Sequence, residues 1–193
     1  MKSIAVFCGS KDGYIDVYRD EAYRLGGILA EREIQLVYGG AKIGVMGAVA
    51  DGVLNAGGKV IGVIPHFLKT KEVVHEGLTE LITVDTMHQR KLKMYENCDA
   101  MMTLPGGWGT MEELFETLTW GQLGMHNKPM GVLNINGYYD SLKVLMMMMV
   151  HEGFLNEWVR KMLMVSESID ELLQMMDDYN APEREQFIDN ISN

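Results

Sequence analysis

Short apolar segments of four to six residues alternate along the chain with longer segments whose apolar residues recur at helical spacing. The short segments predict β-strands, and the longer ones predict α-helices. The expected strands span residues 3–8, 34–38, 59–64, 80–84, 99–104, 130–135 and 162–165. The expected helices span residues 14–31, 45–56, 87–97, 111–123, 138–152 and 169–178.

This alternation predicts an α/β fold with a doubly wound, mainly parallel sheet of about seven strands and helices on both faces. Several expected strands are largely apolar, as strands covered on both faces are. The expected helix 111–123 carries one stripe, which we expect to pack on the sheet. The stripe consists of Met111, Leu114, Phe115, Leu118 and Gln122. Ligands of such sheets bind at the carboxyl ends of the strands, so the turns at those ends are the places where chemistry is expected.

The composition is that of an ordinary globular domain, with 193 residues, 47% of them hydrophobic and 23% charged. We expect one domain over residues 1–180 and an acidic C-terminal tail over residues 181–193. The net charge of −10 argues against nucleic acid polymers as partners, because their binding depends on clustered Lys and Arg. The chain begins directly with an apolar strand, and its longest apolar run is far shorter than the ~20 residues that cross a bilayer. We therefore expect no membrane partner and a cytoplasmic location.

Two glycine-rich turns each lead from an expected strand into a helix. They read Tyr38-Gly39-Gly40-Ala41-Lys42-Ile43-Gly44-Val45-Met46-Gly47 and Leu104-Pro105-Gly106-Gly107-Trp108-Gly109-Thr110-Met111-Glu112-Glu113. Glycine lets the backbone come close to a ligand, and a helix start offers unpaired N–H groups and the positive end of a dipole. We expect the two turns to hold one phosphorylated molecule between them, with simple chain reversal as the open alternative for each. The phosphate-binding candidates are Gly39, Gly40, Gly44, Met46, Gly47, Gly106, Gly107, Gly109 and Thr110.

Two better-known nucleotide motifs do not match these turns. A P-loop requires Lys and then Ser or Thr after its last glycine, whereas Gly44 is followed by Val45 and Met46. A dinucleotide-binding fold requires G-x-G-x-x-G after the first strand, and that turn here reads Cys8-Gly9-Ser10-Lys11-Asp12-Gly13. ATP hydrolysis and nicotinamide chemistry are therefore disfavoured.

Arg90, Glu112 and Glu113 are the candidate chemical groups, because each lies near the end of an expected strand. An arginine can grip a phosphate or carboxylate through two donors at once. Each candidate has a structural alternative. The spacing Thr110-x-x-Glu113 fits a capping box, which from spacing alone is the favoured role of Glu113. Arg90 could be a solvated helix residue beside Lys91.

Two motifs resemble those of one known family. The segment Pro105-Gly106-Gly107-Trp108-Gly109-Thr110-Met111-Glu112-Glu113 matches P-G-G-x-G-T-x-x-E, and Met87-His88-Gln89-Arg90-Lys91 matches M-H-x-R-K. Together they resemble the Lonely Guy family of cytokinin riboside 5′-monophosphate phosphoribohydrolases. The similarity extends over nearly the whole chain and includes Phe7-Cys8-Gly9-Ser10 and Gly137-Tyr138-Tyr139.

The resemblance implies a Rossmann-like fold, a homodimer and a hydrolase. Members of the family are N-glycosidases of cytokinin biosynthesis, which cleave adenosine-type nucleoside 5′-monophosphates (AMP or its N6-modified forms) to free base and ribose 5-phosphate. It implies Arg90 and Glu113 as the catalytic pair. It also implies substrate contacts from Ser10, Glu72, Lys91, Gly107, Trp108, Gly109, Thr110, Met111, Glu112 and Thr119.

Two other classes remain open from the sequence. The chain could be a nucleotide-binding or carrier module without turnover, or an amino-acid decarboxylase, a label that the family has often carried. A decarboxylase of that kind needs pyridoxal phosphate on a Schiff-base lysine, and no lysine stands out in such a setting. The five histidines are scattered without the spacing of metal ligands, so we expect neither a metal nor a cofactor.

Overall fold

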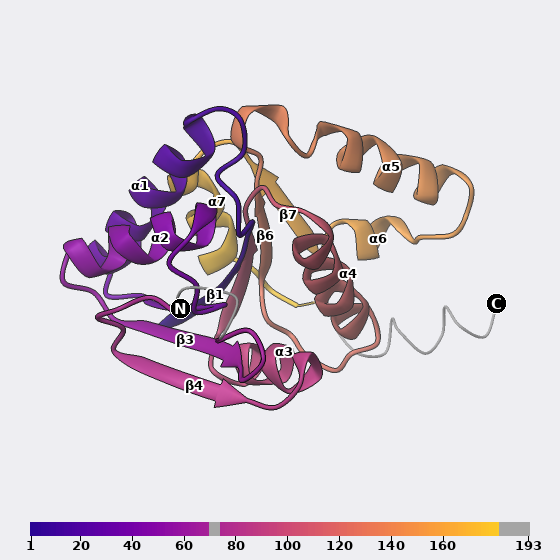
Figure 1. Ribbon diagram of the computed structural model, residues 1–193. Coiled ribbons are helices and arrows are strands. Elements are labelled where there is room, and N and C mark those ends of the chain that lie inside the picture. The colour runs from indigo at the N-terminus through magenta and orange to yellow at the C-terminus, as the bar shows by residue number, and fades with distance from the viewer. Residues whose placement is uncertain (70–73, 182–193) are drawn as a thin grey trace.

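The computed structural model describes residues 1–69 and 74–181, which form one seven-stranded parallel sheet with helices on both sides (Figure 1). The strands follow the order β4-β3-β2-β1-β5-β6-β7, and every neighbouring pair is parallel. Their bounds are β1 Ser3–Phe7, β2 Gln35–Tyr38, β3 Val60–Pro65, β4 Glu80–Val84, β5 Ala100–Thr103, β6 Met130–Leu133 and β7 Leu163–Ser166. The predicted α/β class is confirmed, and each strand lies within two residues of its expected place.

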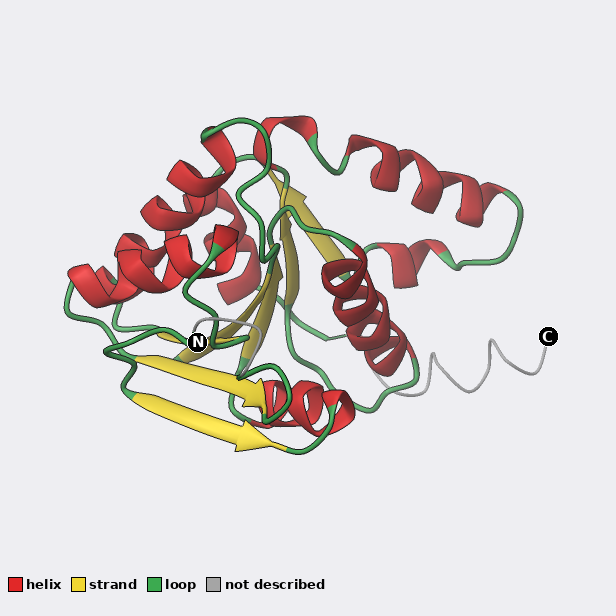
Figure 2. Cartoon of the chain, in the orientation of Figure 1, coloured by secondary structure: helices red, strands yellow, loops and turns green. Residues whose placement is uncertain are grey.

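The helices form two layers, one on each face of the sheet (Figure 2). Their bounds are α1 Val17–Glu31, α2 Gly44–Asn55, α3 Met87–Glu96, α4 Trp108–Gln122, α5 Asp140–His151, α6 Glu157–Arg160 and α7 Ile169–Asp177. Helices α1, α2 and α7 pack on one face, and α3, α4, α5 and α6 pack on the other. The four-residue helix α6 and a 3-10 turn at Ile135–Gly137 were not expected from the sequence.

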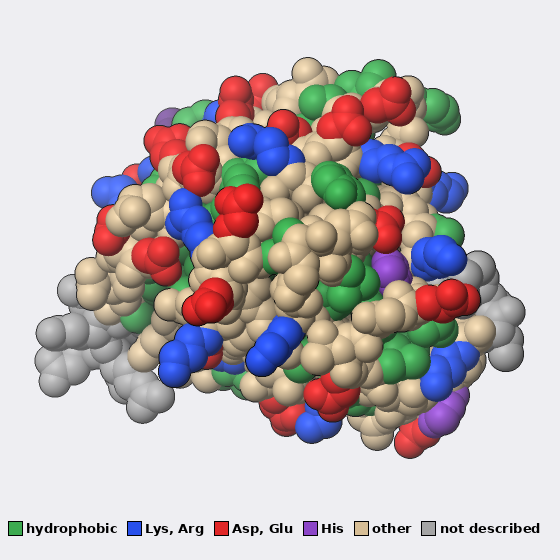
Figure 3. Space-filling view, turned by 90° about the vertical axis from the view of Figure 1, so that its left-hand side faces the viewer, with side chains coloured by type: hydrophobic (Ala, Val, Ile, Leu, Met, Phe, Trp, Pro, Cys, Tyr) green, Lys and Arg blue, Asp and Glu red, His purple; other side chains and the backbone are tan. Residues whose placement is uncertain are grey.

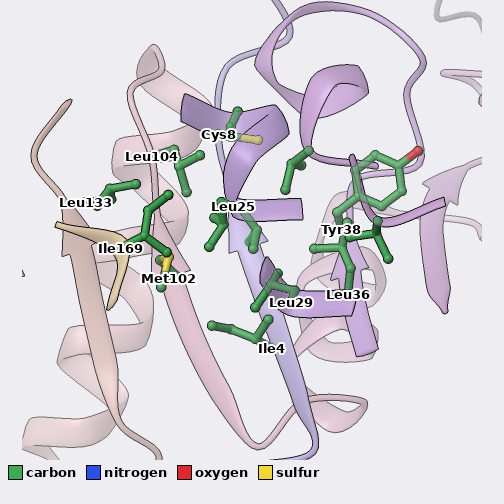
Figure 4. Close-up of a cluster of buried hydrophobic side chains, with 14 of the residues drawn as sticks. Ile4, Cys8, Leu25, Leu29, Leu36, Tyr38, Met102, Leu104, Leu133 and Ile169 are labelled. Atoms are coloured by element: carbon green, nitrogen blue, oxygen red, sulfur yellow. The ribbon is translucent and has the colours of Figure 1, made fainter. Parts of the chain in front are cut away.

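Alternation along the strands divides the core into two parts. In β1, Ile4 and Val6 belong to the cluster beneath α1 and α2, whereas Ala5 and Phe7 belong to the cluster beneath α3 and α4. This follows because successive residues of a strand point to opposite faces. Figure 4 shows the first cluster, with side chains from strands β1, β2, β5 and β6 meeting those of α1. Both cysteines, Cys8 and Cys98, are free and buried.

Helix α4 differs from its prediction in both its start and its buried face. It begins at Trp108, three residues earlier than expected, with Gly107 as its N-cap. Its buried residues are Thr110, Glu113, Leu114, Thr117 and Gly121. The predicted stripe was wrong in orientation, because Phe115 and Gln122 are exposed and only Leu114 of that set is fully buried. The helix instead turns a partly polar face, including Glu113, towards the strand ends.

The connections place a topological switch point between β1 and β5. From β1 the chain moves outward through β2 and β3 to β4, and it then returns to β5 on the other side of β1. Crevices at such points, outside the carboxyl ends of the strands, are where open α/β sheets bind ligands. The turns after the two strands touch, since the Gly9 N–H donates a hydrogen bond of 3.0 Å to the Pro105 carbonyl.

The sequence predicts neither a membrane partner nor a nucleic acid partner, and two structural features bear on these expectations. No helix in the described part of the chain is both long and apolar enough to span a bilayer. Figure 3 shows acidic and basic side chains interspersed on the described part of the face that it presents, without a continuous basic patch there. The acidic tail predicted for residues 181–193 lies, apart from Ala181, outside the described residues.

Candidate functional site

A cavity of about 650 Å³ opens at the switch point. Its walls are the turn after β1, the turn between β5 and α4, the starts of α2 and α3, and the loop after β3. The volume lies within the range of small-molecule sites. Arg90 and Glu113 both line this cavity, so the fold brings together the two residues that the motifs singled out.

Arg90 is held at the floor of the cavity by backbone carbonyls. The residue is only 5% exposed, so the alternative of a solvated helix position is wrong. Its Nε donates to the Val63 carbonyl at 3.1 Å, and its Nη2 donates to the Gly39 carbonyl at 2.9 Å. Two of the five N–H donors of a guanidinium are therefore used for anchoring, and the group is fixed at the carboxyl ends of β2 and β3.

Gly39 makes room for this guanidinium. A Cβ at this position would lie 2.0 Å from Arg90 Nη2, which is far inside any van der Waals contact. The backbone of Gly39 does not have a positive φ, so steric space rather than conformation requires a glycine here. Gly39 thus shapes the site by admitting Arg90.

Glu113 is a buried carboxyl group whose pKa is raised to about 7. Burial is the main cause, because it disfavours the charged form. Arg90 and Lys91 oppose this shift, while the carboxylates of Glu112 and Glu116 add to it. A carboxyl group with this pKa changes its protonation state near neutral pH, as a general base must.

The capping-box role for Glu113 is wrong. Because Gly107 is the N-cap of α4, Thr110 is already inside the helix, and Glu113 lies a turn further along. The N-cap makes no side-chain hydrogen bond. The Glu113 side chain lines the cavity instead.

The start of α4 forms a second wall of the cavity, made of Gly106, Gly107, Trp108, Gly109 and Thr110 together with Glu112. A Cβ added at Gly107 or Gly109 would meet nothing within 4 Å, so a ligand can approach this backbone closely. The helix start presents unpaired N–H groups and the positive dipole end. Gly106 has a packing role instead, because its Cβ would meet Thr110 Oγ1 at 2.1 Å.

The first glycine-rich turn contributes less to the cavity than the second. Met46 lines the cavity, as does Ser10 from the turn after β1. The four glycines of this turn are not among the residues that line it. Gly44 has a φ of +66° and packs against the Ser10 backbone, and Gly47 packs against the Lys42 carbonyl. Gly40 also has a positive φ, of +81°. These glycines shape the turn that supports Arg90 and Ser10.

Three other residues implied by the resemblance lie outside the main cavity, and a fourth falls on a part of the chain that is not described. Met111 is partly buried against the core, and Lys91 contacts carboxylates of α4. Thr119 lines a second, smaller cavity between α4 and α5. Glu72 lies outside the described residues.

The structure also adds residues that the sequence reasoning did not select. Tyr138 lines the main cavity and donates a hydrogen bond of 2.6 Å to the Gly106 carbonyl. Its ring packs edge-on against Tyr18, with ring centroids 5.8 Å apart. Phe67 and Met87 supply apolar surface on another wall. The similarity at Gly137-Tyr138-Tyr139 was the one sequence signal that could have indicated Tyr138.

Among the described residues, no three His, Cys, Asp or Glu side chains are grouped so as to hold a metal ion. The fit to pyridoxal phosphate is also poor. Of the described residues that line the cavity, the one lysine is Lys11, which is exposed on the turn after β1. A Schiff-base lysine must instead sit in a desolvated pocket or beside another cation to be an effective nucleophile.

The fold and the cavity define a class of protein: a doubly wound α/β protein with a small-molecule-sized cavity between a helix start and a buried arginine–glutamate pair. The family model described as "possible lysine decarboxylase" matches residues 46–176. The chain is 44% identical over 187 residues to the Arabidopsis thaliana cytokinin riboside 5′-monophosphate phosphoribohydrolase LOG2, which covers 97% of this chain and 87% of that protein. It is 47% identical to LOG1 of the same plant, over 92% of this chain and 84% of that protein. The chain belongs to this family, as the resemblance predicted.

Solved structures that are similar to this chain show the same fold. The molybdenum cofactor binding protein of Rippkaea orientalis has a TM-score of 0.69 at 20% identity, covering 91% of this chain and 94% of that one. The Moco carrier protein of Chlamydomonas reinhardtii has a TM-score of 0.67 at 19% identity, with the same coverage. At these identities the likeness concerns the fold alone.

Proposed function

We propose that this chain hydrolyses the N-glycosidic bond of adenosine-type nucleoside 5′-monophosphates to free base and ribose 5-phosphate. The observation that carries the proposal is the placement of a buried arginine and a carboxyl group with a raised pKa in one cavity, beside an open helix start. The names of the relatives at 44% and 47% identity support the same reaction.

The 5′-phosphate binds at the start of α4. Backbone N–H groups there and the positive end of the helix dipole favour a phosphate group. The free space at Gly107 and Gly109 allows the phosphate oxygens to approach the backbone. Anchoring the phosphate at this end directs the ribose towards Arg90 and Glu113, which line the same cavity.

Glu113 acts on the water and on the developing charge of the sugar. As the bond between C1′ and the base breaks, its electron pair leaves with the base, and positive charge develops on the ribose ring. An ionised Glu113 stabilises that charge and accepts a proton from the water whose oxygen bonds to C1′. The departing base takes up a proton at the nitrogen that was bonded to C1′, so that the water is divided between the sugar and the base. Because the pKa is about 7, the ionised fraction and the rate both rise as the pH increases through that value.

Arg90 fixes the sugar phosphate relative to Glu113. Its guanidinium is anchored on Val63 and Gly39, and the remaining donors are available to an oxygen of the ribose or the phosphate. Holding the reacting atoms in this geometry removes much of the entropic cost of bringing them together.

The cavity also has an apolar part suited to the base and to a group on its N6 position. Met46, Phe67, Leu68 and Met87 lie on walls that the helix start does not occupy. An adenine ring and an N6-prenyl substituent are both largely apolar and bury their surface favourably against such side chains. We propose AMP and its N6-prenylated forms as the substrate class.

Gly39→Ala should place a methyl group where the Arg90 guanidinium lies and so displace it. We expect kcat/KM to fall by about 10²-fold, the scale reported for misplacing a reacting group by about 1 Å. Release of adenine from AMP, followed by chromatography, measures the effect. Gly27→Ala in α1 is the matched control, because a Cβ there meets nothing within 4 Å. Equal activities of the two variants would contradict the role of Gly39.

We also propose that the chain acts as a homodimer through the outer surface of α4 and α5. Phe115 and Leu118 of α4 and Met146 of α5 line the second cavity, which has a volume of about 120 Å³. Helix α5 also carries four exposed apolar side chains: Val144, Leu145, Met147 and Met148. Exposed apolar surface of this kind is typical of an interface.

The dimer proposal is tested by placing a charge on that surface. Phe115→Glu should convert the dimer to monomers in sedimentation velocity, because a carboxylate buried in an apolar interface is strongly disfavoured. Met175→Glu on α7 is the control, since Met175 and Phe115 are both 37% exposed. A wild-type chain that sediments as a monomer would rule the proposal out.

We propose a cytoplasmic location as well. It is supported by the two cysteines, Cys8 and Cys98, which are both free thiols. Free buried thiols are common in reducing compartments.

A further inference from the structure

Lys91 lies next to Arg90 on α3 but has different partners. Consecutive helical residues point about 100° apart, so Arg90 reaches the strand ends while Lys91 reaches α4. Lys91 Nζ forms ion pairs with Glu112 Oε1 and, at 3.0 Å, with Glu116 Oε1. Its side chain is only 7% exposed, and it is not among the described residues that line the cavity.

The charges around Glu113 show why this placement matters. Helix α4 presents three carboxyl groups towards α3, from Glu112, Glu113 and Glu116, and α3 opposes them with Arg90 and Lys91. Two donors of the Arg90 guanidinium bond to the Val63 and Gly39 carbonyls, whereas Lys91 pairs directly with Glu112 and Glu116. Lys91 is therefore the cation that neutralises Glu112 and Glu116.

Glu112 is the carboxylate that most needs neutralising. It precedes Glu113 and lines the same cavity as the helix start that receives the phosphate. Without Lys91, its charge would repel a phosphate dianion and would also disfavour ionisation of Glu113.

We infer that Lys91 is a positioning residue, which pairs with Glu112 and Glu116 and neutralises their charge. Glu113 is then the one reactive carboxylate in the cavity, and the phosphate meets no uncompensated negative charge. Lys91 acts through Glu112 and Glu116 and does not touch the substrate. The inference rests on the proposed function, since it concerns the same site.

The effect on Glu113 follows from the groups that face it. From α3 these are Arg90 and Lys91, both of which lower its pKa, and from α4 they are Glu112 and Glu116, which both raise it. Cys8 also faces it from the end of β1, and burial raises the pKa of that thiol far beyond the physiological range, so it stays neutral. Removing the Lys91 charge therefore raises the pKa of Glu113, and the acid limb of the pH–rate profile moves to higher pH.

Lys91→Met tests this inference. We expect kcat/KM at pH 7 to fall by about 10-fold to 100-fold, with a raised KM and an acid limb displaced upward by about one pH unit, the scale of a neighbouring like charge. Lys91→Met/Glu112→Gln should recover most of the loss and return the acid limb towards its original position. Lys91→Arg, which keeps the charge, should stay close to the wild type. If the double variant is as impaired as Lys91→Met alone, Lys91 acts on the substrate itself and the inference is overturned.

Binding of ribose 5-phosphate, measured by titration calorimetry, provides a readout that needs no turnover. Lys91→Met should weaken binding about 10-fold, and adding Glu112→Gln should restore it, because the repulsion of the phosphate is removed. If Lys91→Met does not fold, Glu112→Gln alone still tests the inference, since it should move the acid limb to lower pH. An unmoved limb would overturn it. A wild-type protein that binds ribose 5-phosphate but releases no base would count against the proposed reaction. The role of Lys91 could still be tested by comparing the affinities of the variants for ribose 5-phosphate.

Discussion

Glu113→Gln is expected to abolish most base release while leaving nucleotide binding nearly unchanged. The amide has almost the same shape but can neither accept a proton from water nor stabilise positive charge on the ribose. We expect kcat to fall by roughly 10²–10⁴-fold, the usual contribution of a general base. Chromatographic measurement of adenine released from AMP gives kcat, and calorimetric titration gives the affinity for AMP. Undiminished turnover would remove Glu113 from catalysis.

The same substitution should change stability in a pH-dependent way. The folded-state pKa of Glu113 is about 7, above the ~4.3 of a free glutamate, so folding favours the protonated form. The stability associated with that form is complete below the unfolded pKa and is lost as the pH rises through about 7. At pH 8 and above, Glu113→Gln should exceed the wild type in free energy of unfolding by up to about 4 kcal/mol, at about 1.4 kcal/mol per pKa unit.

Denaturant unfolding at pH 5 and pH 8.5 measures this difference. The excess stability of Glu113→Gln should be much smaller at pH 5 than at pH 8.5. Glu96→Gln is the control, because Glu96 lies at the surface end of α3 and pairs with Lys93. A pH-independent difference for Glu113→Gln would show that folding does not raise the pKa of Glu113.

Arg90→Met is the second substitution with a large expected effect. It removes the donors that hold the sugar phosphate and the positive charge that favours ionised Glu113. We expect kcat/KM to fall by about 10²–10³-fold, the cost of losing one preorganised donor that stabilises a transition state. The pH–rate profile should also shift upward, because the pKa of Glu113 rises when Arg90 no longer lowers it.

The structural cost of Arg90→Met can be separated from the catalytic one. The substitution leaves the Val63 and Gly39 carbonyls without their Arg90 donors, at roughly 1–3 kcal/mol for each unsatisfied buried group. Assays must therefore be made where the variant is folded, as judged by denaturant unfolding. Arg24→Met is the control, since Arg24 is an exposed residue of α1 paired with Glu21. If both variants keep full activity at the same pH, Arg90 has no role in the reaction.

The sheet was largely predictable because its strands are short apolar runs separated by turn residues. The four-residue helix α6 (Glu157–Arg160) was not predictable, since it is too short to show a periodic pattern. The start of α4 was misplaced for a different reason. Glycines at 107 and 109 indicate a turn by propensity, yet Trp108 and Gly109 already have helical conformation because tertiary contacts override a weak local preference.

The sequence singled out Arg90 and Glu113, which line one cavity, but it did not show how their side chains are held. Proximity to strand ends and the two motifs indicated Arg90 and Glu113 from the sequence. The roles of Gly39 and Lys91 depend on side chains from helix α3 that reach β2 and α4, respectively. Contacts between segments separated by 51 and 21 residues leave no local trace in the sequence. The same is true of Tyr138, which reaches Gly106 from the end of the 3-10 turn before α5.

Hydrolysis of a nucleotide at its glycosidic bond can be followed with the purified protein. The protein is incubated with AMP, and separately with its N6-prenylated form, in ¹⁸O-labelled water, and the products are analysed by chromatography and mass spectrometry. We expect equal amounts of free base and ribose 5-phosphate, with the label on C1′ of the sugar. Nucleotide that is bound and recovered intact would contradict this expectation and would favour a carrier.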